Sequence, residues 1–401
     1  MKEPLHPSLI VRCAVYLYIA HILLLGKIAL LELTCFWCGF YFCWACARRE
    51  ARVSFHILYF PLFVFALATT LSAIGAGNPA EMYGQSIIWF KVLIFPLSMM
   101  LLREVPRLRE RLVYVYTIFG FGMGGWGLLE YVFQSNRDLE HRINGPVSHV
   151  MTFSGLLMTM SLLFLVLWWH QRKWWQLATI LSATSALVLT YTRSAWLGWM
   201  AAVLVLVAGT RVRRLAMYFL PLALLVITFL PLSIFGRLIS TFDFQQTSNF
   251  DRIRMAQAGI EMIRDHPVLG VGPSNVKEEY ALYRAHDAPR ARPPHLHNNI
   301  IQLWAERGIL GLASYLVFLA LFLRECIRAW STPKKMWAQA GVAITVALAV
   351  AGLFEFNFGD TEVFFLMLNV MAYLLVQMEQ PAEQPEPAMN TTRPLLVPAT
   401  T

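Results

Sequence analysis

Two histidines have the residue type and the surroundings for acid–base chemistry. His295 and His297 end a long polar stretch, 234–298, that separates two apolar segments. A neutral imidazole near pH 7 is a natural general base. The apolar segment that follows would hold both rings rigidly at its start. We predict His297 as a catalytic base, and His295 and Asn298 as ligand-contacting neighbours.

Three cations stand where an apolar sequence would not be expected to place them. Arg193 lies between two apolar runs, Arg252 opens an amphipathic segment, and Lys91 interrupts Trp89-Phe90-Lys91-Val92. A guanidinium binds phosphate oxygens through paired hydrogen bonds. We predict that Arg193 and Arg252 bind an anion such as a diphosphate, with Lys91 in support. Lipid headgroups are the alternative partners for both arginines.

Three further polar residues are weaker candidates for substrate binding. Arg142 belongs to an H-R-I-N-G-P segment, Glu306 lies nine residues after His297 within the predicted span 299–323, and Asp360 closes an N-F-G-D segment. Ionisable groups within a membrane are costly and are usually functional or paired. Glu306 either contacts a ligand or neutralises Arg307.

A metal or nucleotide site is not expected. The H-x-H pair at His295 and His297 could bind zinc, but a third ligand at short spacing is missing, although His286 or Asp287 could serve. The glycine-rich turn at 269–275 is not followed by Gly-Lys-Ser/Thr, so it is not a phosphate-binding P-loop. We predict a reaction without metal or cofactor.

Four of the six cysteines form two C-x-x-C pairs in one apolar segment. On a single helix, Cys35, Cys38, Cys43 and Cys46 cannot surround a metal, and lipid disfavours the thiolate that metals need. We expect them to act as small packing residues.

The composition indicates a membrane protein. Hydrophobic residues make up 57% of the 401 residues, charged residues only 14%, and the mean hydropathy is +0.53. Lipid solvates such a chain, whereas a water-soluble domain would expose apolar surface. Since each span needs roughly 17–25 apolar residues, we predict an all-α, polytopic membrane protein with about twelve spans. These are 9–26, 28–46, 54–73, 85–102, 112–133, 148–169, 174–191, 195–210, 214–233, 299–323, 337–354 and 361–378.

The distribution of cations predicts the orientation. Every second loop is basic, and lysine and arginine collect in cytoplasmic loops. Both termini are therefore expected in the cytoplasm, and the 234–298 loop on the outer side of the membrane, which is the periplasm if the membrane is a Gram-negative inner membrane. The same rule explains the net charge of +9, and no basic-aromatic module indicates nucleic-acid binding. The basic residues are Arg48, Arg49, Arg52, Arg103, Arg107, Arg109, Arg111, Arg172, Lys173, Arg211, Arg213, Arg214, Arg324, Arg328, Lys334 and Lys335.

The chain is expected to have one membrane domain, 1–379, which includes the 234–298 loop, and a Pro- and Glu-rich disordered cytoplasmic tail, 380–401. Helical spacing of apolar residues predicts an amphipathic helix over 251–265 at the membrane surface, capped by Asn249 or Asp251. Its apolar residues are Ile253, Ala256, Ile260 and Ile263.

The ordered set of motifs resembles the O-antigen ligase/polymerase superfamily. The set comprises R-S-A-W-L-G from Arg193 to Gly198, D-R at Asp251 and H-P-V-L-G-V-G ending at Gly272. H-x-H-N and then E-R-G, ending at Gly308, complete it. The order of these motifs, the predicted spans and the long loop before the tenth span match the superfamily over essentially the whole chain.

The resemblance implies a GT-C-like glycosyltransferase. It would move a glycan from undecaprenyl diphosphate to the lipid A-core, with Arg193 and Arg252 on the diphosphate and His297 as base. Membrane lipids would be the other partners, and the oligomeric state stays open. The chain length favours the ligase over two alternatives with the same motifs, O-antigen polymerase and protein O-oligosaccharyltransferase. A lipid or glycolipid transporter and a membrane scaffold are alternatives of other classes.

Overall fold

A computed structural model describes residues 8–25, 28–52, 54–77, 87–134, 142–147, 149–209 and 246–379. Within these residues every regular element is an α-helix, as predicted. The helices are α1 (Leu9–Leu23), α2 (Ile28–Ala47), α3 (Tyr59–Gly75), α5 (Ile87–Glu104), α6 (Pro106–Phe133), α7 (Val150–Gln171), α8 (Trp174–Leu189), α9 (Arg193–Gly209), α12 (Thr247–Asp265), α13 (Val276–Tyr283), α14 (Asn299–Ala329), α15 (Lys335–Ala351) and α16 (Thr361–Glu379).

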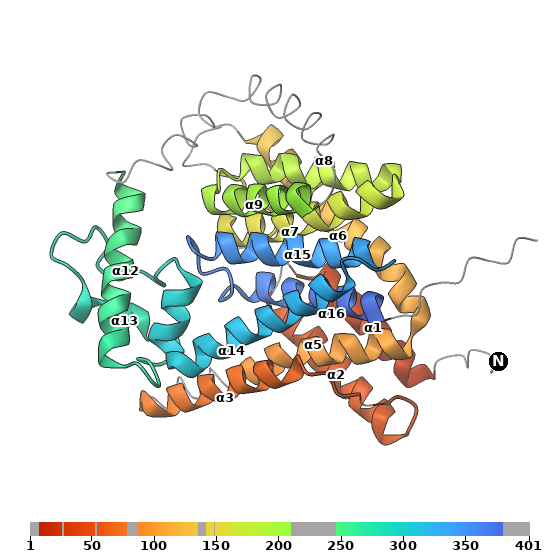
Figure 1. The fold of residues 1–401 in the computed structure, drawn as a ribbon, viewed down its shortest axis with the longest axis horizontal. Coiled ribbons are helices and arrows are strands. Elements are labelled where there is room, and N and C mark those ends of the chain that lie inside the picture. Colours follow the sequence, from red (N-terminus) through yellow and green to blue (C-terminus); the bar gives the residue numbers. More distant parts are fainter. Residues whose placement is uncertain are drawn as a thin grey trace, which may run out of the picture.

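Most of these helices form one bundle, and α12 and α13 lie together at one end of it (Figure 1). Helices α7 and α16 lie at the centre and are apolar on nearly all sides. In each of them, 83% of an apolar stretch of 18 residues is buried inside the protein. A helix that is apolar all round belongs in the interior of a bundle. Around them α1 packs on α2, α9 on α15, α3 on α14, and α8 on both α6 and α7.

The helices coincide with the predicted spans, with one segment untested. Every predicted span except 214–233 overlaps a helix, and 214–233 lies outside the described residues. By length and composition, five of the described helices can cross a membrane: α2, α6, α7, α14 and α16. The helices α1, α3, α8, α9 and α15 are apolar but shorter, with 10–17 residues. The chain is therefore a helical protein with several membrane-type helices, and the full number of spans stays a prediction.

Polar contacts define the two ends of the bundle. At the start of α16, Thr361 accepts a hydrogen bond from Lys91 Nζ at 2.9 Å. At the other end of α16, Glu379 accepts two hydrogen bonds from Arg103, at 2.8 and 2.6 Å. We call the described residues 246–298 the lid, the Thr361 side of the bundle the lid end, and the Glu379 side the opposite end.

The lid has a small hydrophobic core of its own. It is built by α12, α13 and the segment before α14, and it joins Ala305 of α14. A β-carbon on Gly259 would lie 2.4 Å from Ile301, so the absence of a side chain lets α12 approach α14 closely. The buried residues of the lid core are Met255, Ala258, Met262, Val271, Val276, Tyr280 and Leu296.

One detail of the predicted lid helix is wrong, and another is not tested. Ile253 and Ile260 are 40% and 42% exposed, so the isoleucine stripe is not the face that packs on the protein, and its place at the membrane surface stays a prediction. The helix begins earlier than predicted, at Thr247 after Gln246, so neither Asn249 nor Asp251 caps it. Both side chains instead bind arginines: Asn249 binds Arg193, and Asp251 Oδ2 lies 3.0 Å from Arg290 Nε.

The cysteines of α2 pack as expected of small apolar residues. Cys35 and Cys38 are buried, Cys43 is exposed, and all four are free thiols. The Cys38 thiol lies against α1 and donates to the carbonyl of Ala14 at 3.3 Å.

Candidate active site

Arg193 joins the bundle to the lid. It is the first residue of α9 and is only 7% exposed. Its guanidinium donates to three residues at the start of the lid: to Gln246 Oε1 at 2.9 Å, Ser248 Oγ at 3.0 Å and Asn249 Oδ1 at 2.7 Å. A cation at a helix N-terminus is opposed by the helix dipole, so Arg193 is not placed for the stability of α9.

Arg193 and Arg252 line one cavity of about 200 Å³. Arg252 reaches it from α12, and the neighbouring Ile253 and Ala256 form part of the wall. Ile253, the first residue of the predicted apolar stripe, therefore faces this cavity. Two guanidinium groups that are distant in sequence are brought together in a partly enclosed site, which suits a ligand with several anionic oxygens.

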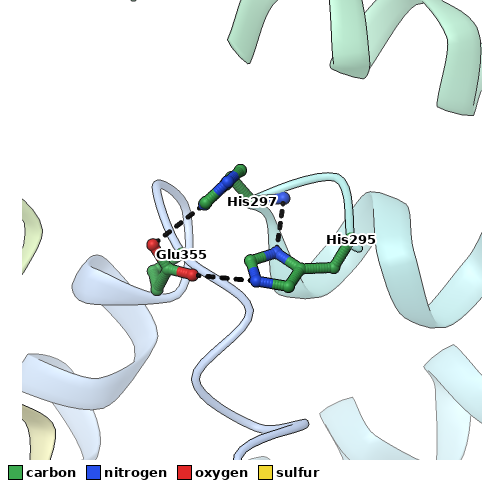
Figure 2. Close-up of side chains that lie close together, drawn as sticks. All are labelled: His295, His297 and Glu355. Carbon is green, nitrogen blue, oxygen red and sulfur yellow. Dashed lines mark hydrogen bonds and ion pairs between the residues drawn. The ribbon is translucent and has the colours of Figure 1, made fainter. Parts of the chain in front are cut away.

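Beside this cavity, Glu355 lies between two histidines (Figure 2). Its Oε2 is 2.9 Å from His297 Nδ1, and its Oε1 is 3.5 Å from His295 Nε2. The two imidazole rings meet edge to face, with centroids 4.3 Å apart. Arg252 Nη2 approaches the same carboxylate at 3.9 Å. One buried carboxylate thus connects the predicted base with one of the predicted anion-binding arginines.

The electrostatics keep Glu355 ionised. Burial alone would raise its pKa, but the hydrogen bond and charge of His297, followed by the charges of His295 and Arg252, lower the pKa to about 2. Burial lowers the pKa of His295 to about 4, against the attraction of Glu355. Burial also lowers the pKa of Arg252, although the negative charge of Glu355 acts to raise it. At neutral pH the cluster therefore contains a charged carboxylate and a neutral His295.

The contact with Glu355 determines which nitrogen of His297 can act as a base. If Nδ1 donates its proton to the carboxylate, Nε2 keeps its lone pair and can accept a proton from a substrate. The hydrogen position is assigned from this geometry. His297 also has a left-handed backbone, with φ of 51°, a conformation that non-glycine residues adopt rarely and often at functional sites.

The same three residues could in principle hold a metal ion. The candidate ligand atoms of His295, His297 and Glu355 all lie within 4.8 Å of one another. Glu355 is thus the third donor near the H-x-H pair. Asp287, which the sequence suggested as a possible third metal ligand, pairs instead with Arg254. However, the cationic Arg252 at the same carboxylate would repel a divalent ion. The donor set is already satisfied as a hydrogen-bonded cluster.

Asn298 fixes the position of His297. Its Oδ1 accepts from the backbone N–H groups of Ile300 and Ile301 at 2.9 and 3.0 Å, which makes it the N-cap of α14. Its amide donates to the carbonyl of Leu353, two residues before Glu355, at 2.9 Å. The structure therefore gives Asn298 a positioning role, and its predicted substrate contact stays a prediction.

Glu306 connects three parts of the chain. Its carboxylate pairs with Arg307 and accepts from Gln302 Nε2 at 2.7 Å and from the N–H of Ser274 at 2.9 Å. Its carbonyl accepts from Ser72 Oγ of α3 at 2.6 Å. Of the two predicted roles, the structure shows neutralisation of Arg307 directly.

The H-P-V-L-G-V-G and E-R-G motifs form one contact. Gly308 has φ of 64° and kinks α14. A β-carbon there would lie 1.8 Å from the carbonyl oxygen of Val268, and one on Gly270 would lie 2.4 Å from the backbone of Glu306. Only glycine allows so close an approach of two backbones. The two motifs are therefore neighbours in space because they anchor the lid to the bundle.

The remaining predicted residues do not line the cavity that contains Arg193. Lys91, His295, Glu306 and Asp360 line a second cavity of about 290 Å³ at the lid end. Arg142 lines neither of these two cavities and instead donates to the carbonyl of Thr190 and to Thr192 Oγ1, each at 2.7 Å. It supports the turn that presents Arg193.

The sequence did not single out Glu355 as a site residue, nor Arg307, which also lines the second cavity. A signal for Glu355 exists: it is an acidic residue in the short segment 352–360 between two apolar spans, on the side predicted to face outward. Burying a charge at such a position is costly, and the same argument that selects Asp360 from the sequence also selects Glu355.

Comparison with known proteins gives one family match. Residues 177–316, from α8 through the lid to the middle of α14, match the family model described as O-antigen ligase. No curated protein matches. The matched segment contains Arg193, Arg252 and both histidines, and the match confirms the resemblance to the O-antigen ligase family.

Proposed function

We propose that the protein is an O-antigen ligase, which transfers O-antigen polysaccharide from undecaprenyl diphosphate to the lipid A-core in lipopolysaccharide biosynthesis. One observation supports this most directly. The cavity with Arg193 and Arg252 lies beside the Glu355–His297 pair, and Arg252 contacts both. A diphosphate site and a general base are what transfer from this donor requires.

The proposed reaction is a direct displacement. An acceptor hydroxyl oxygen attacks the anomeric carbon and forms the new C–O bond, while the bond from that carbon to the diphosphate oxygen breaks. The leaving diphosphate keeps the electron pair, and Arg193 and Arg252 stabilise its charge. His297 Nε2 takes the hydroxyl proton, and Glu355 stabilises the resulting imidazolium. In-line attack inverts the anomeric centre, and neither a metal nor a nucleotide takes part.

The expected orientation places this chemistry outside the cytoplasm. Arg103, from a loop predicted to be cytoplasmic, lies at the opposite end from the lid. By the positive-inside rule, the opposite end faces the cytoplasm with both termini, and the lid end faces the periplasm. A lipid-anchored donor and a lipid-anchored acceptor would both reach the lid end from the membrane.

The direct test uses Arg193→Ala and Arg252→Ala in a strain that lacks the chromosomal copy of the gene. Removing one charge-assisted contact to the leaving group is expected to lower transfer roughly 100-fold or more. Lipopolysaccharide gels should then lose the O-chain ladder while the protein still inserts. Arg264→Ala is the matched control, since Arg264 is an exposed lid arginine paired with Glu261. A normal ladder in either site variant contradicts the proposal.

The banding of the deletion strain separates the related activities. Loss of all O-chains with accumulation of undecaprenyl-linked polymer identifies a ligase. A core with one repeat unit identifies a polymerase. Normal lipopolysaccharide with unglycosylated periplasmic protein identifies an oligosaccharyltransferase. If the protein is instead a lipid transporter, the purified protein should not transfer the glycan from the donor to the acceptor.

The metal-free reaction is tested separately, because His295, His297 and Glu355 could form a metal site. Addition of EDTA to a purified transfer assay should leave the rate unchanged. Loss of activity that zinc or magnesium restores would show that the cluster binds a metal.

A further inference from the structure

The second cavity has the composition of a sugar-binding site. About 290 Å³ is close to the lower limit of small-ligand pockets, roughly 300–1,000 Å³. It has room for one or two sugar residues but not for a polymer chain. Its walls come from α3, α5, α14, the lid and the segment that precedes α16.

One wall of this cavity is aromatic. Phe358 meets Phe65 and Phe364 edge to face, with ring centroids 5.3 and 4.9 Å apart. Phe356 continues the wall next to His295, with centroids 6.0 Å apart. Packing against one another leaves Phe65, Phe358 and Phe364 only 3%, 8% and 3% exposed, so Phe356 is the most accessible ring of this wall. The C–H faces of a pyranose pack on surfaces of this kind.

The facing polar groups are suited to hydroxyls. Lys91 Nζ is held by Thr361 at 2.9 Å and lies 3.9 Å from Glu32. Asp360 accepts from Thr152 Oγ1 at 3.1 Å. Arg307 lies over the ring of Phe65 and also lines the cavity, while its Nη1 pairs with Glu306. A cation with spare donors and a carboxylate with a second oxygen can together bind neighbouring hydroxyls of one sugar.

The position of the cavity relates it to the reacting groups. His295 lines it, and His295 contacts both His297 and Glu355. Phe354 lines the arginine cavity, whereas Phe356 lines this one. Glu355 and the two histidines therefore lie between the two cavities.

We infer that the second cavity binds the terminal sugar of the acceptor, and that Lys91, Arg307 and Asp360 hold its hydroxyls while the aromatic wall packs on its face. This inference rests on the proposed function and assigns the acceptor to the side of the histidines opposite the donor diphosphate. It also moves Lys91 from the predicted diphosphate site to the acceptor site.

The experiment measures transfer and binding in the full-length protein in detergent. Lys91→Gln and Asp360→Asn should raise the KM for the acceptor about tenfold each, which corresponds to the loss of roughly one hydrogen bond to a charged group. The KM for the undecaprenyl-diphosphate donor should stay within about twofold. Arg252→Gln should show the reverse pattern, and Arg264→Gln should change neither constant.

Direct binding keeps the inference separate from the activity. The probe is delipidated core oligosaccharide, followed through the melting temperature of the protein. Wild type and Arg264→Gln should be stabilised by the probe, and Lys91→Gln and Asp360→Asn should not. A change in the donor KM, unchanged acceptor kinetics, or equal stabilisation of all variants overturns the inference even if transfer occurs. Failure of transfer with specific binding intact overturns the proposed function alone.

Discussion

Two glutamates at opposite ends of the bundle have the same kinds of partner and different geometry. At the opposite end, Glu379 receives two short hydrogen bonds from Arg103, and His56 Nε2 lies farther away, at 3.7 Å. At the lid end the order is reversed: the histidine His297 is the closest partner of Glu355, at 2.9 Å, and Arg252 is the most distant, at 3.9 Å.

This difference separates a structural ion pair from the proposed catalytic cluster. Arg103 uses its bidentate geometry on Glu379, so little of its hydrogen-bonding capacity is left for a ligand. Arg252 is held near Glu355 by charge, and its Nε is buried without a partner among the described residues. The carboxylate at the lid end instead orients an imidazole. The two ends have the same residue types around a glutamate, and they differ in which residue lies closest to its carboxylate.

The largest effect is expected when the closest partners are removed at both ends. His297→Ala should lower transfer by about 100-fold or more, the usual contribution of a general base. His56→Ala should change the rate less than twofold, because His56 is a distant partner of a structural pair. The rate of glycan transfer by the purified protein measures both. Similar losses in the two variants would remove the distinction between the ends.

Neutralising the carboxylates gives the next largest effect. Glu355→Gln leaves His297 Nδ1 without its anionic acceptor, and the loss of a charge-assisted hydrogen bond of about 1.5–3 kcal/mol corresponds to roughly 10- to 100-fold in rate. Glu379→Gln should lower the melting temperature but leave the rate per folded molecule unchanged. The combination of rate and melting curves checks both, and an unaffected rate in Glu355→Gln would show that His297 needs no orientation.

Replacing arginine with lysine tests the geometry of the cations. Lysine keeps the charge but loses the planar fork. Arg252→Lys should raise the donor KM roughly tenfold, whereas Arg103→Lys should affect stability alone. Donor-dependent kinetics at a fixed acceptor concentration measure the first effect. An unchanged donor KM would mean that Arg252 contributes only its charge.

The smallest effect concerns Asp360, a lid-end carboxylate with no cation in direct contact among the described residues. Burial, assisted by the charge of Glu355, raises its pKa from 3.8 to about 7. A raised pKa gives a stabilisation that is complete below about pH 4 and is lost as the pH rises through about 7. Asp360→Asn should abolish this loss and melt several degrees above wild type at pH 8. If the melting temperatures of wild type and Asp360→Asn differed by the same amount at every pH from 4 to 8, the raised pKa of Asp360 would be contradicted.

The sequence predicts much of this site because its main groups are chemically conspicuous. Arg193 is a cation between apolar runs, and His297 precedes a long apolar helix, so residue type and hydropathy are sufficient to select them. Their proximity is a different matter. It depends on the lid folding back so that Asn249 reaches Arg193, and on α15 ending where Gly352 accepts the N–H of Asn299 at 2.7 Å. Such long-range packing has no local sequence pattern.

The face of α12 that packs on the bundle is likewise set by long-range packing. Helical periodicity selects Ile253 and Ile260 because they are the most apolar residues. Packing selects the face with Gly259, because close approach to Ile301 and Leu296 is possible only there. Shape, in this case, outweighs hydrophobicity, and Ile253 is left to line the arginine cavity.

The hydrogen bonds of Arg193 have a consequence for how the lid responds to a ligand. The guanidinium belongs to the bundle, whereas Gln246, Ser248 and Asn249 belong to the lid. An anion that takes N–H donors now used for these residues would compete with the contacts. Anion binding and lid docking are then linked reciprocally: each weakens the other by the same factor. The donor headgroup would thereby loosen the cover of its own site on arrival, and its departure would restore that cover.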